Sequence, residues 1–318
     1  MKLPRDPYKW RGQRKSHANK RMNSECRLFQ GRRAGVRLSD SQRPYDTLIL
    51  EKSNRIATIT LNRPERLNAI NEQMRSEIAS ACDEIASDRS VSVVILKGMG
   101  RAFSVGIDIN KSDRGSNLHS GDTVADWANI HRKQDFLWKI WDLPKPVIAQ
   151  VHGYALGLGS VLMTVCDLVV VTHDLRIGNA RTLMGAGVEG PKYVWSVGLR
   201  RAKWLDFLPG WRITGDEAVD WGWANLAVGA DEIDDEVNAL AAQIAVMPLS
   251  HLMLRKASMN RVWEQLAFRS SVMAASDLDA IAHKSDDGVM MEAASASSGF
   301  IALGAEQCSQ YPARHGRD

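Results

Sequence analysis

Residues 145–159 read KPVIAQVHGYALGLG and place a β-branched apolar run directly before a glycine-rich turn. The run Pro146–Val151 predicts a buried strand, and the apolar residues after Gly159 predict a helix. Glycine allows positive φ and close backbone approach, and the first amides of a helix have no partner within the helix. The segment therefore predicts a turn that presents backbone N–H groups.

A second turn of this kind lies at residues 98–109, which read GMGRAFSVGIDI and follow the apolar strand Val91–Leu96. Two such turns facing one cleft could direct two N–H donors at one oxygen, as in an oxyanion hole. Dinucleotide binding is the alternative, and it needs a third glycine after Gly157 and Gly159. Ser160-Val161-Leu162 follows instead, which argues against a nicotinamide-dependent enzyme.

The rest of the first 230 residues predicts further strands that alternate with helices. Leu48–Glu51 and Ile56–Leu61 read as a hairpin with Ser53-Asn54 in its turn, and Asn71 is expected to cap a helix through about residue 86. Leu168–Thr172 is another buried strand. Strands separated by helices indicate crossover connections and a parallel sheet, so the fold class is α/β.

The pattern becomes helical after about residue 200. Thr214 is expected to cap a helix containing Asp216–Trp221. Further helices are expected at residues 232–246, 249–259, 261–283 and 286–302. We therefore expect an α/β core at residues 44–230 and a helical region at residues 231–318, for which the family resemblance described below implies a role in oligomerisation. Packing or subunit contact is the expected role of the tryptophans, nine of which lie between Trp127 and Trp263.

Charge divides the 318 residues unevenly. Residues 1–43 hold 13 Lys or Arg and 3 Asp or Glu, whereas the whole chain has a net charge of only +4. This basic segment has few aliphatic residues, so we expect a disordered tail. A nucleic-acid-binding or targeting arm is the alternative, but few aromatic residues are interleaved with the charges, so we do not expect a nucleic-acid partner.

Cysteine spacing and hydropathy exclude several classes of protein. The four cysteines lie far apart with no CxxC pair, so no metal site is expected and a reducing compartment fits. The longest apolar run is broken by Asp167 and falls short of the roughly 20 residues of a membrane span. No secretory signal opens the chain. We expect a cytoplasmic protein with no membrane partner.

Five motifs between Tyr45 and Val228 stand in the order and at the spacing of a known superfamily. They are LNRPERLNAI at 61–70, RAFSVGIDI at 101–109, the quoted 145–159 segment, CDL at 166–168, and ITG at 213–215 followed by Ala218, Trp221-Gly222 and Asn225. With these motifs the chain resembles the crotonase (enoyl-CoA hydratase/isomerase) superfamily.

The resemblance implies a spiral core of ββα repeats, a C-terminal trimerisation region, and a trimer or dimer of trimers. It implies a coenzyme A thioester as substrate, with coenzyme A as part of that substrate and no separate cofactor. The thioester oxygen would accept hydrogen bonds from the backbone amides of Ile107 and Leu158.

Substrate and coenzyme A contacts are expected from the same two turns and from nearby cations. The positions are Arg66, Val105, Asp108, Lys111, Gly157 and Arg181. Of these, Arg66 and Lys111 could meet the coenzyme A phosphates, and Arg181 could bind a substrate carboxylate.

The chain lacks both of the acids that the hydratase pattern contains. A hydratase needs one carboxylate to activate water and another to handle the proton on the α-carbon. The resemblance puts them at Val161 and Arg181, and neither residue is an acid. Simple hydration of an enoyl-CoA is therefore not expected.

Glu189 is the candidate replacement, because some relatives carry a catalytic acid near this point, including dienoyl-CoA isomerases and β-diketone hydrolases. A carboxylate in an apolar pocket has a raised pKa and can exchange protons near neutrality. The alternative is a Glu189–Arg181 salt bridge that only shapes the loop. We expect an isomerase or C–C hydrolase; a non-catalytic protein that binds coenzyme A thioesters is the alternative.

Overall fold

The structure, a computed structural model, describes residues 45–108, 122–179, 190–208 and 210–290. By its contacts the chain divides into two units, residues 1–43 and residues 44–318, and the described residues all belong to the second. The expected basic tail and the positions Lys111, Arg181 and Glu189 lie outside the described residues.

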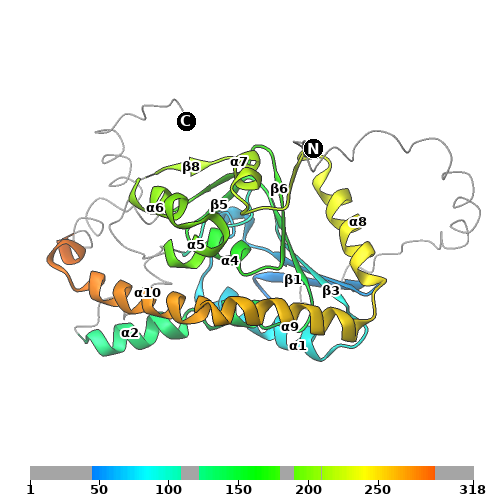
Figure 1. The fold of residues 1–318 in the computed structure, drawn as a ribbon, viewed down its shortest axis with the longest axis horizontal. Helices are drawn as coiled ribbons and strands as arrows, with labels where there is room; N and C mark the ends of the chain where they lie inside the picture. The colour runs from blue at the N-terminus through cyan, green and yellow to red at the C-terminus, as the bar shows by residue number, and fades with distance from the viewer. Residues whose placement is uncertain (1–44, 109–121, 180–189, 209, 291–318) are drawn as a thin grey trace, which may run out of the picture. The chain divides into compact units, whose positions relative to one another are not determined.

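A six-stranded sheet forms the centre of the fold (Figure 1). Its order is β1 (Leu48–Ser53), β2 (Ile56–Leu61), β3 (Val93–Gly98), β4 (Val147–Val151), β6 (Leu168–Thr172) and β9 (Leu226–Val228). Only the β1–β2 pair is antiparallel; the other neighbours are parallel. The parallel α/β arrangement expected from the alternating pattern is confirmed.

The hairpin turn differs by one residue from the prediction. Ser53 still pairs with Ile56, so the turn consists of Asn54 and Arg55, whose φ angles are 51° and 66°. A two-residue turn with positive φ at both positions matches the right-handed twist of the strands.

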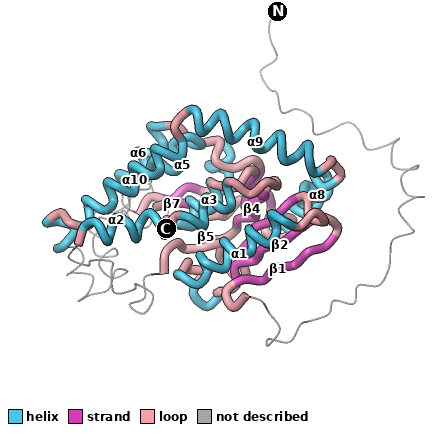
Figure 2. Tube along the Cα trace, turned by 90° about the horizontal axis from the view of Figure 1, so that it is seen from below, coloured by secondary structure: helices cyan, strands magenta, loops and turns pink. Residues whose placement is uncertain are grey.

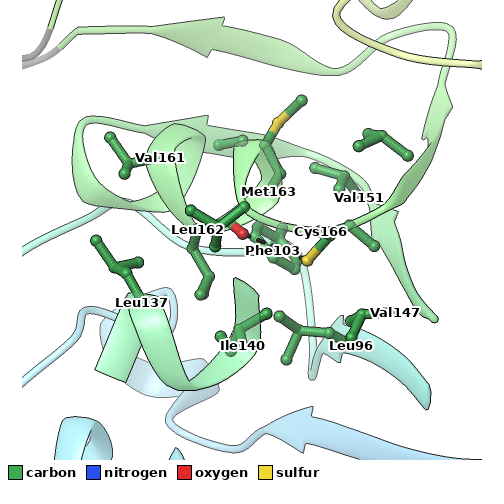
Figure 3. Packing of buried hydrophobic residues seen from close by; sticks show 14 of the residues in the cluster. Leu96, Phe103, Leu137, Ile140, Val147, Val151, Val161, Leu162, Met163 and Cys166 are labelled. Atoms are coloured by element: carbon green, nitrogen blue, oxygen red, sulfur yellow. Dashed lines mark hydrogen bonds between the residues drawn. The ribbon is translucent and has the colours of Figure 1, made fainter. Parts of the chain in front are cut away.

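Both faces of the sheet are covered by helices. On one face α1 (Glu72–Ser87), α3 (Asp135–Trp141) and α4 (Leu158–Thr164) contribute to the main core (Figure 3). On the other face α8 (Ile233–Ala245) packs on β3, β4 and β6 through Val237 and Ala241. Near-continuous apolar strands such as VVILKG and VIAQV follow from this double coverage.

A smaller three-stranded sheet stands beside the large one. It contains β5 (Tyr154–Leu156), β7 (Arg176–Gly178) and β8 (Arg212–Ile213). Strand β5 comes two residues after β4, so the chain leaves the large sheet and enters the small one at the His152–Gly153 turn. The glycine-rich turn therefore lies where the two sheets meet.

The remaining helices surround this core (Figure 2). They are α2 (Thr123–Arg132), α5 (Gly190–Val197), α6 (Leu199–Phe207), α7 (Gly215–Asp220), α9 (Leu249–Gln265), α10 (Phe268–His283) and the 3-10 turn Pro64–Arg66. Helix α10 contacts both α2 and α5. Residues 286–290 are also helical, and the rest of the helix expected there lies outside the described residues.

Side-chain caps fix two helix starts as the sequence predicts. Asn71 accepts a hydrogen bond from the Met74 amide at 2.9 Å, and Thr214 forms a reciprocal capping box with Glu217. The predicted helix break near residue 260 is wrong. Helix α9 runs through it to Gln265, and Ala267, at φ 66°, makes the break instead.

An aromatic cluster explains this position of the break. Phe268 is 1% exposed, and its ring lies 4.7 Å from Trp141, 5.1 Å from Trp263 and 5.9 Å from Trp138. Burying Phe268 among these indoles turns the chain at Ala267 and holds the α9–α10 corner against α3. Packing, the expected role of the tryptophans, is confirmed for these three.

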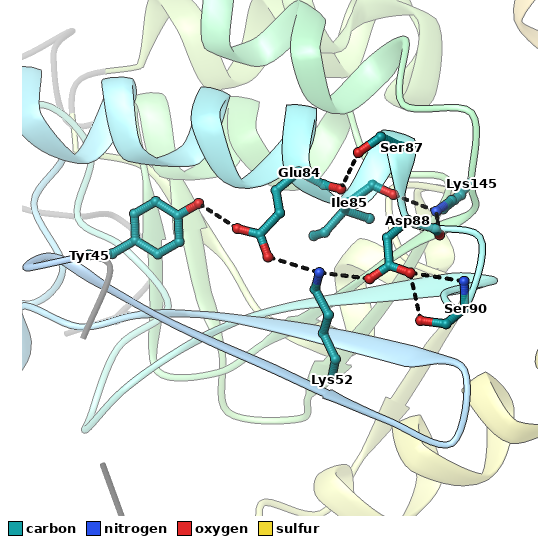
Figure 4. A network of polar contacts seen from close by, with 8 residues as sticks. All are labelled: Tyr45, Lys52, Glu84, Ile85, Ser87, Asp88, Ser90 and Lys145. Carbon is teal, nitrogen blue, oxygen red and sulfur yellow. Dashed lines mark hydrogen bonds and ion pairs between the residues drawn. The ribbon is translucent and has the colours of Figure 1, made fainter. Parts of the chain in front are cut away.

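A polar network joins β1 to the end of α1 (Figure 4). Lys52 forms ion pairs with Glu84 and Asp88, each at 2.8 Å, and Tyr45 donates to Glu84 at 3.1 Å. Hydrogen bonds from Lys52 and Ser90 hold the pKa of Asp88 far below its usual range. The network lies near the start of β3, whereas the glycine-rich turns follow the ends of β3 and β4.

Candidate active site

The first glycine-rich turn is held between two other segments by parallel bridges. Ile107 bridges to Ile70 on one side, and Ser104 bridges to Ala155 of β5 on the other. The Gly106 carbonyl accepts from the Ile70 amide at 2.7 Å, and the Asp108 amide donates to the Ile70 carbonyl at 3.1 Å. The turn is therefore pinned from both sides.

These bonds orient the amide of Ile107. In a trans peptide the carbonyl and the following N–H point in opposite directions. Since the Gly106 carbonyl points at Ile70, the Ile107 N–H points away from Ile70. No hydrogen bond between described residues uses this N–H.

The second turn supplies an amide of the same kind at Leu158. Gly157 has φ 51° and ψ −120°, its N–H donates to the Gly178 carbonyl at 2.9 Å, and α4 begins at the next residue. The Leu158 N–H belongs to the first turn of α4 and has no acceptor within the helix. Among the described residues it has no hydrogen-bond partner either.

The two turns approach each other backbone to backbone. A Cβ added to Gly106, whose φ is 93°, would lie 2.6 Å from the Leu156 carbonyl oxygen and 3.1 Å from the Leu158 nitrogen. A Cβ on Gly159 would lie 2.4 Å from the Ser104 carbonyl oxygen. Only glycine fits at either place. The Ile107 and Leu158 amides therefore lie on adjacent turns, and neither has a hydrogen-bond partner in the described part of the chain.

Two buried polar residues, which the sequence analysis did not single out, support the first turn. Asn68 is fully buried and has a φ of 53°. Its side-chain amide donates to the backbone carbonyls of Met99 and Ala102 at 2.9 and 2.8 Å. The Ser104 hydroxyl donates to the Asn68 carbonyl at 2.8 Å and accepts from the Gly106 amide at 3.1 Å. An asparagine between the apolar residues Leu67 and Ala69 is the signal that could have revealed this support.

The predicted contact residues of the first turn have different surroundings. Asp108 is 6% exposed and pairs with Arg63 at 2.8 Å, and Arg63 also donates to the Ala69 carbonyl. This pair locks the end of the turn to the LNRPERLNAI segment. Val105 is half-buried, and Arg66 is exposed on the 3-10 turn.

Val161 lies on α4, one turn after Leu158, and is 1% exposed (Figure 3). It belongs to the main apolar core. The position that the resemblance assigns to the first hydratase acid therefore holds an aliphatic side chain. Its neighbour Ser160 is also buried, and the Ser160 hydroxyl donates to the Gly157 carbonyl at 2.7 Å.

Asp206 on α6 contacts one residue before and one residue after positions 180–189, which include Arg181 and Glu189. Asn179, just before these positions, and Tyr193, on α5 just after them, both donate to Oδ1 of Asp206. The Asn179 and Tyr193 side chains are 3% and 1% exposed. The chain on either side of the expected catalytic acid is thus fixed to one carboxylate.

Metal and membrane features are absent from the described residues. No group of three or more His, Cys, Asp or Glu side chains there could hold a metal ion. In the same part of the chain no single helix is long and apolar enough to cross a membrane; α8 and α9 pass that test only together, across a 105° bend.

Known proteins share this sequence and fold. The model of the enoyl-CoA hydratase/isomerase family matches residues 51–292. Probable enoyl-CoA hydratases of Mycobacterium bovis and Rhizobium meliloti are 31% and 30% identical to this chain, over 69% of its length and 83% of theirs.

Solved structures give the same result. A crystal structure of enoyl-CoA hydratase from Mycobacterium smegmatis matches with a TM-score of 0.77 and 26% identity, covering 85% of this chain and 96% of that one. A putative enoyl-CoA hydratase/isomerase from Novosphingobium aromaticivorans matches with a TM-score of 0.76 and 28% identity, covering 86% and 100%. The spiral α/β core and the helical C-terminal region are those of the crotonase fold, and the chain belongs to the enoyl-CoA hydratase/isomerase family.

Proposed function

We propose that this chain is an enzyme that moves a proton on a coenzyme A thioester, and that it acts as an isomerase or C–C hydrolase in preference to a hydratase. The observation that carries this preference is Val161. Its buried, apolar side chain occupies the position of a hydratase acid, so the site has one candidate acid, Glu189, where hydration needs two.

Isomerisation requires only one acid–base group. Glu189 takes a proton from the carbon next to the carbonyl group or from a conjugated carbon, and the electron pair moves to the thioester oxygen. The Ile107 and Leu158 amides stabilise that oxygen while its charge develops. Glu189 then returns the proton to a different carbon, and the double bond has moved.

Cleavage of a β-dicarbonyl bond is the second reaction that suits one acid. Glu189 takes a proton from water, and the water oxygen adds to a carbonyl carbon. The bond to the neighbouring carbon breaks and leaves an enolate, which the same two amides hold until it takes up the proton. The products are a carboxylic acid and a shorter carbonyl compound.

Arg66 and Lys111 are proposed to contact the coenzyme A phosphates, and Arg181 a substrate carboxylate. The exposure of the Arg66 side chain beside the first turn supports this role. Val105, Asp108 and Gly157 are proposed to shape the pocket around the thioester.

A trimer or dimer of trimers is proposed for the assembly. The support comes from large apolar side chains on α9, on α10 and between them that are more than half exposed. They are Leu254, Met259, Val262, Leu266, Leu278 and Ile281. Light scattering should give about three or six times the chain mass of 35.3 kDa, and a monomer would contradict the proposal.

The deciding experiment compares substrates and one variant. Purified protein is given crotonyl-CoA, a 3-enoyl-CoA, a dienoyl-CoA and a β-diketone. We expect isomerisation or cleavage, little hydration, and at least a 100-fold loss of rate in Glu189→Gln, because a general acid–base contributes roughly 10²- to 10⁴-fold. Glu51→Gln, at an exposed residue of β1, should keep full rate.

Two outcomes would contradict the proposal. Rapid hydration of crotonyl-CoA would mean that other groups replace the two missing acids. Thioester binding without turnover of any substrate would instead favour the non-catalytic alternative.

A further inference from the structure

Ser104 is a fully buried residue whose hydroxyl binds one residue of the first glycine-rich turn and one residue of the LNRPERLNAI segment. It donates to the Asn68 carbonyl at 2.8 Å and accepts from the Gly106 amide at 3.1 Å. A hydroxyl that both donates and accepts has no free rotation, so these two contacts fix its position relative to the backbone. The Asn68 carbonyl is itself held in place, because the Asn68 side-chain amide donates to the carbonyls of Met99 and Ala102.

The two peptide planes on either side of Gly106 are both held by hydrogen bonds. The plane before it carries the Gly106 N–H, which donates a hydrogen bond to the Ser104 hydroxyl oxygen. The plane after it carries the Gly106 carbonyl, which Ile70 binds, and the Ile107 N–H on the opposite side. Glycine can turn about φ in either direction, so without the hydroxyl only one of these planes would remain fixed.

We propose that Ser104 is a positioning residue that aims the Ile107 amide at the thioester oxygen. This inference rests on the proposed function, in which the Ile107 and Leu158 amides bind that oxygen. Removing the hydroxyl leaves the buried Gly106 N–H without its partner and releases the peptide plane before it. The bonds to Ile70 then hold the Ile107 peptide plane without support from the plane before Gly106, so the Ile107 N–H loses part of its alignment with the Leu158 N–H.

The expected effect is confined to ligands that carry a carbonyl oxygen. Misalignment of the Ile107 amide weakens a bond to the thioester oxygen, whereas contacts to the nucleotide and the acyl chain are unchanged. One hydrogen bond contributes up to about 1.5 kcal/mol, and a factor of ten in affinity corresponds to about 1.4 kcal/mol. Selectivity for a thioester over a thioether of the same shape should therefore fall about tenfold.

The experiment measures dissociation constants for butyryl-CoA and S-butyl-CoA by calorimetry. The first has the thioester carbonyl, and the second replaces it with a methylene group. We expect wild type to prefer the thioester, and Ser104→Ala to lose about tenfold of that preference with its affinity for the thioether unchanged. Ser104→Cys, which keeps a weak donor and acceptor, should lie between them.

A matched control separates this role from general stability. Ser92 is also fully buried, and its hydroxyl accepts from Arg55 at 3.0 and 2.7 Å beside the first residue of β3, whereas the turn follows the end of that strand. Ser92→Ala should lower the melting temperature and leave the ligand preference at its wild-type value. Ser104→Cys carries the test if Ser104→Ala does not fold.

Two results would overturn the inference while the proposed function stands. One is an unchanged thioester preference in folded Ser104→Ala and Ser104→Cys. The other is an equal loss of affinity for both ligands, which would indicate a purely structural role. Wild type with no preference for the thioester would overturn the proposed oxyanion hole itself, and this inference with it.

Discussion

The Tyr193 hydroxyl donates to Oδ1 of Asp206 at 3.2 Å, and the same oxygen accepts from the Asn179 amide at 3.0 Å. Asn179 lies directly before the 180–189 segment and Tyr193 lies shortly after it. One carboxylate on α6 therefore joins described residues on either side of positions 180–189.

Tyr193→Phe should loosen this attachment. The change removes one hydrogen bond and leaves the buried ring, so we expect a loss of about 1 kcal/mol in the free energy of unfolding. Hydrogen exchange of a peptide covering residues 180–192, measured by mass spectrometry, should become faster, because one anchor of the segment is weaker. Tyr45→Phe removes the hydroxyl that binds Glu84 and should leave exchange in that peptide unchanged. Equal exchange in wild type and Tyr193→Phe would argue against the attachment.

Gly106→Ala should disrupt the proposed oxyanion hole directly. The new Cβ would lie 2.6 Å from the Leu156 carbonyl oxygen and 3.1 Å from the Leu158 nitrogen, so the two turns must separate. We expect the preference for butyryl-CoA over S-butyl-CoA to disappear. The control is Gly198→Ala, which has a similar φ of 82° but nothing within 4 Å of its Cβ. It should lose roughly 1 kcal/mol of stability from backbone strain and keep the preference. A Gly106→Ala protein that still prefers the thioester would contradict the proposed hole.

Phe268→Ala should cost about 3–5 kcal/mol of unfolding free energy, as expected for a fully buried aromatic side chain. The cavity would lie between α3, α9 and α10, where the ring contacts Trp138, Trp141 and Trp263. Urea unfolding followed by tryptophan fluorescence measures the change. Val246→Ala, at a side chain that is 79% exposed, should change stability by less than about 0.5 kcal/mol. Similar losses in both variants would mean that the cluster does not hold the corner.

Asp88 should make stability depend on pH in the acid range. Its hydrogen bonds from Lys52 and Ser90 lower the pKa in the folded state, so the unfolded chain binds the proton more readily. The stability that Asp88 contributes is then present above the ordinary pKa of about 3.9 and is lost as the pH falls below it. At pH 6 the free energy of unfolding should be larger for wild type than for Asp88→Asn. This difference should shrink as the pH falls from about pH 4 downward. Ser90→Ala should give a smaller difference with the same trend, and a difference that stays constant with pH would contradict this explanation.

Much of the framework could be predicted because it depends on local sequence. The caps at Asn71 and Thr214, the apolar strands and the strand-to-helix turn at Gly157 each involve residues within a few positions of one another. The helix break at Ala267 and the short strands of the small sheet could not be found this way. Burial of Phe268 against α3 decides the first, and pairing between residues 22 to 36 positions apart decides the second.

The sequence by itself determined the family, the two glycine-rich turns and the absence of an acid at position 161, because these depend on residue identity and spacing along the chain. Only the tertiary structure decided how the turns meet. Gly106 lies against Leu156 and Leu158, Ser104 fixes Gly106 to Asn68, and Asp206 joins Asn179 to Tyr193. Each of these contacts depends on atoms brought within hydrogen-bonding or van der Waals distance by packing of the two sheets and their helices, and no local pattern encodes such distances.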